Sequence, residues 1–345
     1  MSSPGDDEVK RVILEEVAQS HRQWTGIAVM PDGQRVFVNF PRWSDDVPVS
    51  LGLLDPRDKS VDPFPNAEWN HWDGSTWEVG FTFVCVQSVV ADRDGYLWVL
   101  DNGNPRFSGN PSRRVIPGAP KLLKFDTQDG RLLLKIPYIG PDILPQSYLN
   151  DVRIDTIRGI AYLTDSGKGA IIVTDLQSGI SHRLLDDHFS VEAEAIDVVI
   201  DGKPWRRKDD GGIPRVHADG IALSPDNTTL YFQALTGRTL YRISTAYLVD
   251  FELTPEQLGN KVEKVGVTGP ADGIDFAPDG TLYLTSLEDH AVKRLMSDGT
   301  TQIVVQHHLL EWPDSFAMTG DGTLYITTSR IHLGQGPYSI FRFKP

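Results

Sequence analysis

Short apolar strands recur along this chain in pairs, and a tight polar turn joins the two strands of each pair. Val, Ile, Leu, Tyr and Phe fill the strands, and Asp-Gly or Asp-Asn supplies the positive φ that a hairpin turn requires. The first residues of the six hairpins are Gly26, Ser88, Asp151, Gly220, Gly273 and Ser315. The shortest interval, 42 residues from Gly273 to Ser315, is the length of a four-stranded blade, and the longer intervals leave room for loops.

Further apolar strands follow most of the hairpins. Examples are 121–125 with 132–136, then 170–174, 239–243 and 291–295. The sequence therefore predicts an all-β, six-bladed β-propeller with four antiparallel strands per blade, because a linear β-solenoid has shorter repeats.

The domain organisation that we predict is a single propeller over residues 24–345, preceded by a helical extension over residues 1–23. Within the extension, Val12, Ile13 and Val17 are spaced as on one face of a helix, which predicts a short helix from Asp7 to Ser20.

Composition narrows the range of partners. The formal net charge of −14 comes from 47 acidic and 33 basic residues, so we expect no nucleic acid partner. No apolar run is long enough to span a membrane. Residues 1–10 lack the basic start and apolar stretch of a secretory signal, so we expect a soluble, cytoplasmic protein. The partner that we expect is a small molecule.

Residues with candidate chemical roles lie just before the first strand of each hairpin. In a propeller these strands line the axis, so the residues that precede them form a ring at one mouth of the channel. The ring residues are Thr25, Gln87, Asn150, Asp219, Asp272 and Asp314. Three carboxylates on one narrow ring repel one another, and hard oxygen ligands suit Ca²⁺ or, alternatively, Mg²⁺. The alternative is that these Asp residues cap the strands through backbone hydrogen bonds.

The chemical roles of the ring residues depend on whether a metal ion is bound in the ring. A metal would polarise a carbonyl or activate water, with Asp219 or Asp272 as the general base. His217 and Arg215 precede the fourth ring position closely enough to contact a ligand, with His217 as a proton carrier or a structural hydrogen-bonding group. For substrate binding we select Gln87, Arg215, Asp272 and Trp43, although Trp43 also suits simple packing.

The order of segments resembles the major royal jelly protein and Yellow family. The carrying segments are 38–43 (VNFPRW), 64–69 (FPNAEW), 86–103 (VQSVVADRDGYLWVLDNG), 161–166 (AYLTDS) and 231–245 (YFQALTGRTLYRIST). The resemblance implies a six-bladed propeller with a ligand site at one channel mouth. Some members are linked to dopachrome conversion and others to binding small aromatic amines. Insect members are secreted and carry cysteines, whereas this chain has the single Cys85 and looks like a microbial, intracellular relative.

A weaker resemblance connects the chain to the calcium-dependent lactonases of the regucalcin and gluconolactonase type. In that family, acidic and Asn side chains at the starts of innermost strands hold a metal on the channel axis. The resemblance implies Asn150, Asp219 and Asp314 as metal ligands, although Thr25 is no ligand of that type.

These observations favour a small-molecule enzyme, with metal-assisted hydrolysis of a lactone-like substrate as the first hypothesis. The second is metal-free isomerisation of a quinone-like aromatic such as dopachrome, with His217 and the carboxylates moving protons. The third is a non-catalytic protein that binds small aromatic amines, with ring Asp residues pairing the ammonium group.

Overall fold

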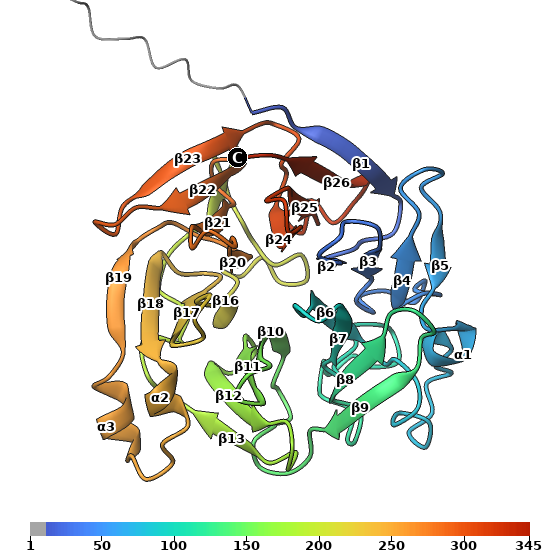
Figure 1. Cartoon of the computed structure of the whole chain (residues 1–345), viewed down its shortest axis with the longest axis horizontal. Coiled ribbons are helices and arrows are strands. Elements are labelled where there is room, and N and C mark those ends of the chain that lie inside the picture. The colour runs from blue at the N-terminus through green and yellow to red at the C-terminus, as the bar shows by residue number, and fades with distance from the viewer. Residues whose placement is uncertain (1–11) are drawn as a thin grey trace, which may run out of the picture.

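Six sheets of four antiparallel strands stand around a central channel in the computed structural model, which describes residues 12–345 (Figure 1). The predicted six-bladed β-propeller is confirmed. In five blades the chain runs from the innermost strand outward, as it does in each predicted repeat.

The strands of the first three blades follow the predicted hairpins closely. Blade 1 contains β2 (Ile27–Val29), β3 (Val36–Asn39), β4 (Leu51–Leu54) and β5 (Val61–Pro63). Blade 2 contains β6 (Val86–Ala91), β7 (Tyr96–Asp101), β8 (Lys121–Asp126) and β9 (Leu132–Pro137). Blade 3 contains β10 (Leu149–Asp155), β11 (Ile160–Asp165), β12 (Ala170–Asp175) and β13 (Ser181–Leu184).

The remaining blades complete the circle. Blade 4 contains β16 (Ala218–Leu223), β17 (Thr229–Ala234), β18 (Thr239–Ser244) and β19 (Glu263–Val267). Blade 5 contains β20 (Ile274–Phe276), β21 (Leu282–Ser286), β22 (Ala291–Leu295) and β23 (Thr301–Gln306). Blade 6 contains β24 (Pro313–Met318), β25 (Leu324–Thr328), β26 (Tyr338–Phe343) and, as its outermost strand, β1 (Glu15–Ser20).

The prediction of a helix that reaches Ser20 is wrong for the described part of that segment, because residues 15–20 form β1. This strand pairs antiparallel with β26 and closes the propeller. Val17 and Ala18 are buried in the core of blade 6, and a bulge between Glu16 and Ala18 puts two neighbouring apolar residues inward. The propeller sheet therefore begins before residue 24, and the predicted helical residues 7–11 lie outside the described part of the chain.

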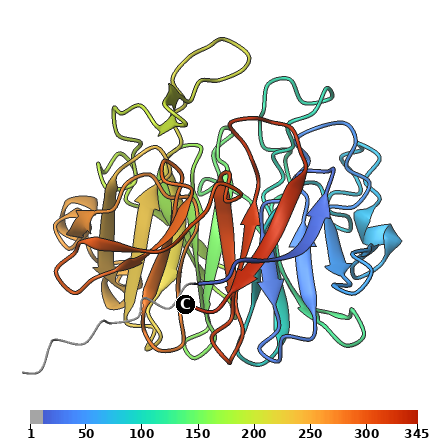
Figure 2. The ribbon, with the colours of Figure 1, turned by 90° about the horizontal axis from the view of Figure 1, so that it is seen from above.

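Few elements lie outside the blades. Within residues 12–345, three short helices, α1 (Ala67–Asn70), α2 (Thr245–Leu248) and α3 (Pro255–Gly259), lie at the rim, and β14 (Val199–Ile200) pairs with β15 (Lys203–Pro204) in a loop. Figure 2 shows this loop and other long loops rising from one side of the disc, which we call the loop face, with the hairpin turns on the other side, the turn face. In residues 12–345 no helix is long and apolar enough to cross a membrane.

Two Asp residues at the ends of second strands fix the segments that lead into the channel. The buried carboxylate of Asp101 accepts hydrogen bonds from the backbone N–H groups of Val84 and Cys85 and pairs with buried Lys121 at 2.7 Å. Asp165 does the same in the next blade, where it accepts from the N–H of Tyr148 and pairs with Arg183 at 2.7 Å. Since an unpaired buried charge is costly, each of these pairs holds its strand start in one position.

Closure by β1 predicts that Ala18→Asp lowers stability by about 2 kcal/mol or more, because it buries a carboxylate at a fully buried position of the closing strand. The measurement is the melting temperature and the urea midpoint. Gln19→Asp is the matched control, since Gln19 is exposed on the same strand. Equal melting of the two variants would contradict the role of β1 in closure.

Candidate functional site

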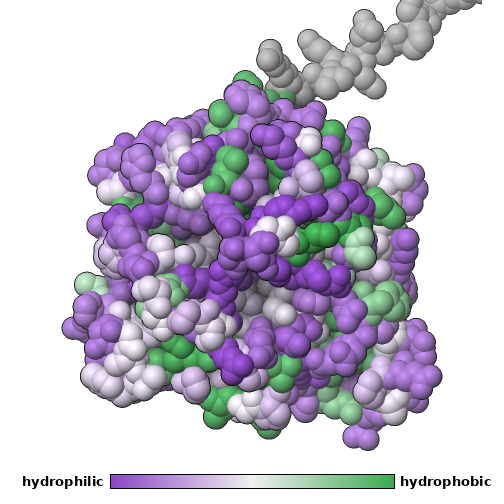
Figure 3. All heavy atoms as spheres, turned by 180° about the vertical axis from the view of Figure 1, so that it is seen from behind, coloured by the Kyte–Doolittle hydropathy of each residue, from purple (hydrophilic) through white to green (hydrophobic). Residues whose placement is uncertain are grey.

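The structure forms the predicted ring at the ends of the innermost strands that lie towards the loop face. Thr25, Gln87, Asp219, Asp272 and Asp314 are all buried, and Asn150 is half-buried. Figure 3 views the molecule from the side opposite to Figure 1, onto the loop face, and shows hydrophilic side chains around its centre. The expected convergence of these side chains is therefore observed, while their chemical roles remain predictions.

Irregular strand pairing directs the ring side chains into the channel. A register shift coincides with Gln87 in β6, with Asn150 in β10, with Asp219 in β16 and with Asp314 in β24. A β-bulge turns a side chain away from its regular alternation and is common beside functional sites. Small residues next to the ring allow the strands to approach: a Cβ at Gly273 would collide with the backbone oxygen of Asp314.

One chain of hydrogen bonds runs round half of the ring. The indole Nε1 of Trp43 donates to the Tyr148 hydroxyl at 2.6 Å, and this hydroxyl donates to Oε1 of Gln87 at 2.7 Å. Gln87 Nε2 then donates to Oδ1 of Asn150 at 3.1 Å. Finally, Asn150 Nδ2 donates to Oδ2 of Asp219 at 2.6 Å.

Trp43 sets the direction of this whole chain. An indole N–H can only donate, so the Tyr148 oxygen accepts from Trp43 and its own proton goes to Gln87. The orientation of each amide is thereby fixed, although the nitrogen and oxygen of an amide are otherwise hard to distinguish. The consequence is that Asn150 presents an N–H donor, and not its oxygen, to Asp219.

The ring continues through the carboxyl groups. Besides burial, the charge of Asp219 raises the pKa of Asp272, which places these two carboxyls close together, and Trp312 Nε1 donates to Oδ2 of Asp272 at 2.6 Å. Asp314 accepts from the hydroxyl of Ser315 at 2.9 Å. Thr25 instead accepts from Asn39 at 3.1 Å, within its own blade.

All three ring carboxyls hold protons more tightly than ordinary Asp residues. Burial raises the pKa of Asp219 well above its usual value, and the nearby charges of Asp314 and Asp151 raise it further. Burial also raises the pKa of Asp272, again with Asp314 contributing. Burial raises the pKa of Asp314 to about 7. The ring therefore carries both protonated and ionised carboxyls near neutral pH.

The predicted calcium ligands meet this geometry only in part. Asp219 and Asp314 supply hard oxygens in one buried ring, as Ca²⁺ requires. However, Asn150 gives its oxygen to Gln87 and its N–H to Asp219, so its amide would have to turn over to join a metal. Across residues 12–345, no group of three or more His, Cys, Asp and Glu side chains is arranged to hold a metal ion. Calcium or magnesium binding stays a prediction.

His217 and Arg215 both fasten a loop of the loop face. His217 Nδ1 accepts from the backbone N–H of Ala193 at 3.2 Å, and Arg215 donates to the backbone oxygen of the same residue at 2.9 Å. Burial lowers the pKa of His217, and the charge of Arg215 lowers it further, so the imidazole is neutral at pH 7. These contacts fit the structural alternative, and a catalytic role for His217 stays a prediction.

Four residues near the ring were not selected from the sequence. Tyr148 and Trp312 stand two residues before Asn150 and Asp314, just ahead of the innermost strands β10 and β24. This repeated position is the signal that would have found them. Arg106 comes from a long loop, and its guanidinium lies over the rings of Tyr148, at 4.3 Å, and Trp43, at 5.3 Å. His332 stacks on Trp312 at 5.7 Å.

A cavity of about 540 Å³ opens on the loop face beside Trp43 and Arg106. Arg113 and Lys208 add positive charge to its lining, and Asp45 adds one carboxylate. No ring side chain lines this cavity, and it is connected to the ring through the contacts of Trp43 and Arg106 with Tyr148. Burial raises the pKa of Asp219 but the charge of Arg106 lowers it, so this guanidinium lies near the ring carboxyls.

The raised pKa of Asp314 predicts a pH-dependent effect on stability. The folded protein keeps a proton at Asp314 that the unfolded chain releases at about pH 4, so this residue costs stability increasingly as pH rises from about 4 to about 7. Asp314→Asn removes that cost, so its stability relative to the parent protein should be greater at pH 7.5 than at about pH 4.5. Urea unfolding at both pH values measures it. The exposed Asp129→Asn is the control, and an Asp314→Asn difference that does not change with pH would contradict the assignment.

Comparison with known proteins agrees with the propeller. The solved structure of a gluconolactonase from Xanthomonas campestris superposes with a TM-score of 0.58 at 14% identity, covering 97% of this chain and 90% of that one. At this identity the likeness shows the fold alone. It confirms the expected similarity to gluconolactonase-type propellers.

Insect proteins are among the curated relatives of this chain. Major royal jelly protein 7 of Apis mellifera is 24% identical over 275 residues, which are 76% of this chain and 57% of the relative. Dopaminechrome tautomerase of Drosophila melanogaster is 26% identical over 176 residues, 49% of this chain and 37% of the relative. The chain spans about half the length of the curated relatives that it matches. The family model described as major royal jelly protein matches residues 84–333, and this chain therefore belongs to the major royal jelly protein family.

Proposed function

We propose that the loop-face mouth of the channel binds a small aromatic molecule and moves a proton within it, as a metal-free isomerase of the tautomerase type. The observation that carries this proposal is the neighbouring pair of buried carboxyls, Asp219 and Asp272, whose pKa values are both raised. One protonated and one ionised carboxyl side by side are the acid and the base that a tautomerisation needs.

The proton balance is simple. The ionised carboxylate takes a proton from carbon of the substrate, the electron pair moves through the conjugated system to a carbonyl oxygen, and the neighbouring carboxylic acid protonates that oxygen. No oxidant, reductant or water is consumed. Trp312, which donates to Asp272, and Asn150, which donates to Asp219, each stabilise the ionised form of their partner. In this proposal the pair as a whole carries one proton.

Substrate recognition is assigned to the aromatic and cationic surface above the ring. Arg106 covers Tyr148 and Trp43, so a flat conjugated ring can stack there while the guanidinium binds a carboxylate or carbonyl oxygen. A relative named dopaminechrome tautomerase supports a quinone-like aromatic as the substrate class. His332 stays outside the proton transfer in this proposal, because burial lowers its pKa to about 4.

Metal-assisted hydrolysis of a lactone-like ester is the second candidate. Its supporting observation is the mutual repulsion of Asp314 with Asp219 and Asp272, which a divalent cation would relieve. If the amide of Asn150 turned over, Asn150, Asp219 and Asp314 would hold that cation, which would polarise the ester carbonyl. Binding of an aromatic amine without turnover is the third possible outcome.

The proposed proton transfer predicts that Asp219→Asn and Asp272→Asn each reduce conversion of dopaminechrome at least about 100-fold, because each removes the acid or the base. The loss of substrate absorbance, measured in EDTA and corrected for the uncatalysed rate, reports this. Asp321→Asn is the control, since its carboxylate is exposed on a hairpin turn. Binding of dopaminechrome without conversion by the parent protein would reject catalysis and support the binding protein.

The choice between the two catalytic candidates predicts a result for metal removal. Under the proposed mechanism, the melting temperature and the tautomerase activity are the same in EDTA and in excess CaCl₂. A melting temperature that calcium raises, and that Asp219→Asn makes insensitive to calcium, would support the hydrolase instead, because a bound ligand stabilises the folded state. Hydrolysis of gluconolactone only in the presence of calcium would settle the assignment in favour of the second candidate.

A further inference from the structure

A second cavity opens at the other mouth of the channel, on the turn face. It has a volume of about 550 Å³ and reaches up to Gly26, Ser88, Asp151, Gly273 and Ser315, the residues that directly follow five of the ring positions. None of the six ring side chains lines it. The ring therefore lies between two separate cavities, and this one takes no part in the proposed isomerase site. Its size is typical of small-molecule sites.

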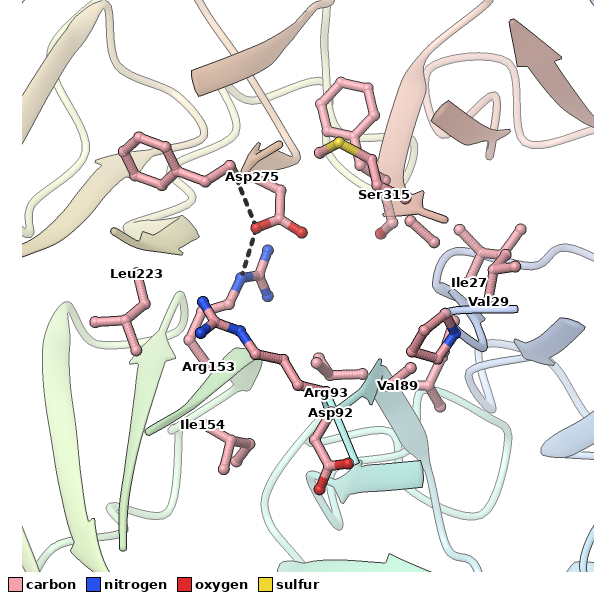
Figure 4. A pocket seen from close by; sticks show the side chains of 18 of the residues that line it. Ile27, Val29, Val89, Asp92, Arg93, Arg153, Ile154, Leu223, Asp275 and Ser315 are labelled. Carbon is pink, nitrogen blue, oxygen red and sulfur yellow. Dashed lines mark hydrogen bonds and ion pairs between the residues drawn. The ribbon is translucent and has the colours of Figure 1, made fainter. Parts of the chain in front are cut away.

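One side of the cavity is cationic. Figure 4 shows the side chains of Arg153 and Arg93 extending into the opening. Arg153 is held by Asp151 at 3.0 Å and by the backbone oxygen of Ile274 at 2.9 Å. Its Nε lies 3.5 Å from Asp275 and makes no hydrogen bond within residues 12–345. Arg153 is therefore held between two carboxylates, and its half-buried guanidinium borders the cavity.

The carboxylates near the two arginines already have hydrogen-bond or ion-pair partners. Asp151 and Asp275 both pair with Arg153. Burial raises the pKa of Asp275, and the charge of Arg153 opposes that shift. Asp92 points away from the opening in Figure 4 and binds the indole of Trp98 at 2.8 Å. Arg93, which is exposed and donates to the backbone oxygen of Pro225 at 2.8 Å, leaves a positive charge at the opening.

The opposite side of the cavity is apolar. Ile27, Val29 and Val89 face the opening across from the two arginines in Figure 4, and Phe276 and Met318 also line the cavity. An apolar wall facing guanidinium groups binds a molecule that has one apolar and one anionic end. The wall gains free energy by burying apolar area, and the guanidinium forms charge-assisted hydrogen bonds to the anion.

We propose that the turn-face mouth is a second ligand site, which binds a compact amphiphilic anion such as an aromatic or medium-chain carboxylate. The carboxylate lies at Arg93 and Arg153, and the apolar body lies against Ile27, Val29 and Val89. The site is independent of the proposed tautomerase activity, because its residues do not belong to the hydrogen-bonded ring.

The test is isothermal titration calorimetry of the whole protein with three probes: indole-3-acetate, its neutral amide and octanoate. The carboxylate should bind at least about tenfold more tightly than the amide, because a charge-assisted hydrogen bond contributes about 1.5 kcal/mol or more. Tighter binding of indole-3-acetate than of octanoate would indicate an aromatic ligand, and the reverse order would indicate an alkyl chain.

Variants locate the site. Arg93→Gln should weaken indole-3-acetate binding several-fold without changing the melting temperature, since Arg93 is exposed. Arg131→Gln is the matched control, an exposed arginine on the turn between β8 and β9. Arg153→Gln should abolish binding, with its melting temperature measured because Asp151 and Asp275 lose their partner. Val89→Glu, on the apolar wall, should also abolish it.

Three results would overturn the proposal: no binding of either carboxylate, equal binding of indole-3-acetate and its amide, or binding that Arg93→Gln leaves unchanged. Loss of binding in Asp219→Asn with no effect of Arg93→Gln would place the probe at the ring instead. Failure of the isomerase proposal would appear as absent turnover with probe binding intact, so the two proposals fail separately.

Discussion

The pairing of β1 with β26 is the contact on which the rest of the molecule depends. It joins a strand near the start of the chain to the last strand and closes the circle of blades. In an open circle, blades 1 and 6 would lose their contacts, and the innermost strands would no longer converge on one axis. Thr25 and Asp314 lie on either side of this junction, so the geometry of the ring depends directly on closure.

Closure brings like charges together, and the local structure determines what those charges can do. Bulges at Gln87, Asn150, Asp219 and Asp314 turn polar side chains into a buried ring. The indole N–H of Trp43 then gives a direction to the chain of amides that ends at Asp219. Burial raises the pKa of each of the three carboxyls, and the neighbouring negative charges raise it further.

The two ends of the channel differ in character although they share the same strands. The loop-face mouth has protonated carboxyls beneath Arg106 and two aromatic rings, whereas the turn-face mouth sets Arg93 and Arg153 against an apolar wall. Successive residues of an innermost strand face in turn the channel and the neighbouring strands. A bulge changes which residues of that strand face the channel. The two proposed sites therefore lie at opposite mouths of one propeller and differ in the side chains that they present to a ligand.

The sequence by itself determined the repeats, because hairpin turns and period-two apolar strands are local features. It also located the ring, since residues before equivalent strands must meet at one mouth. It could not reveal that Glu15–Ser20 pairs with β26, because Val12, Ile13 and Val17 suit a helix locally and only a partner more than 300 residues away makes the segment a strand. Nor could it show how the Asn150 amide is oriented, that the pKa of Asp219 is raised, or that Arg106 lies over Tyr148. Those properties come from side chains of different blades and loops, and only the closed tertiary structure brings them together.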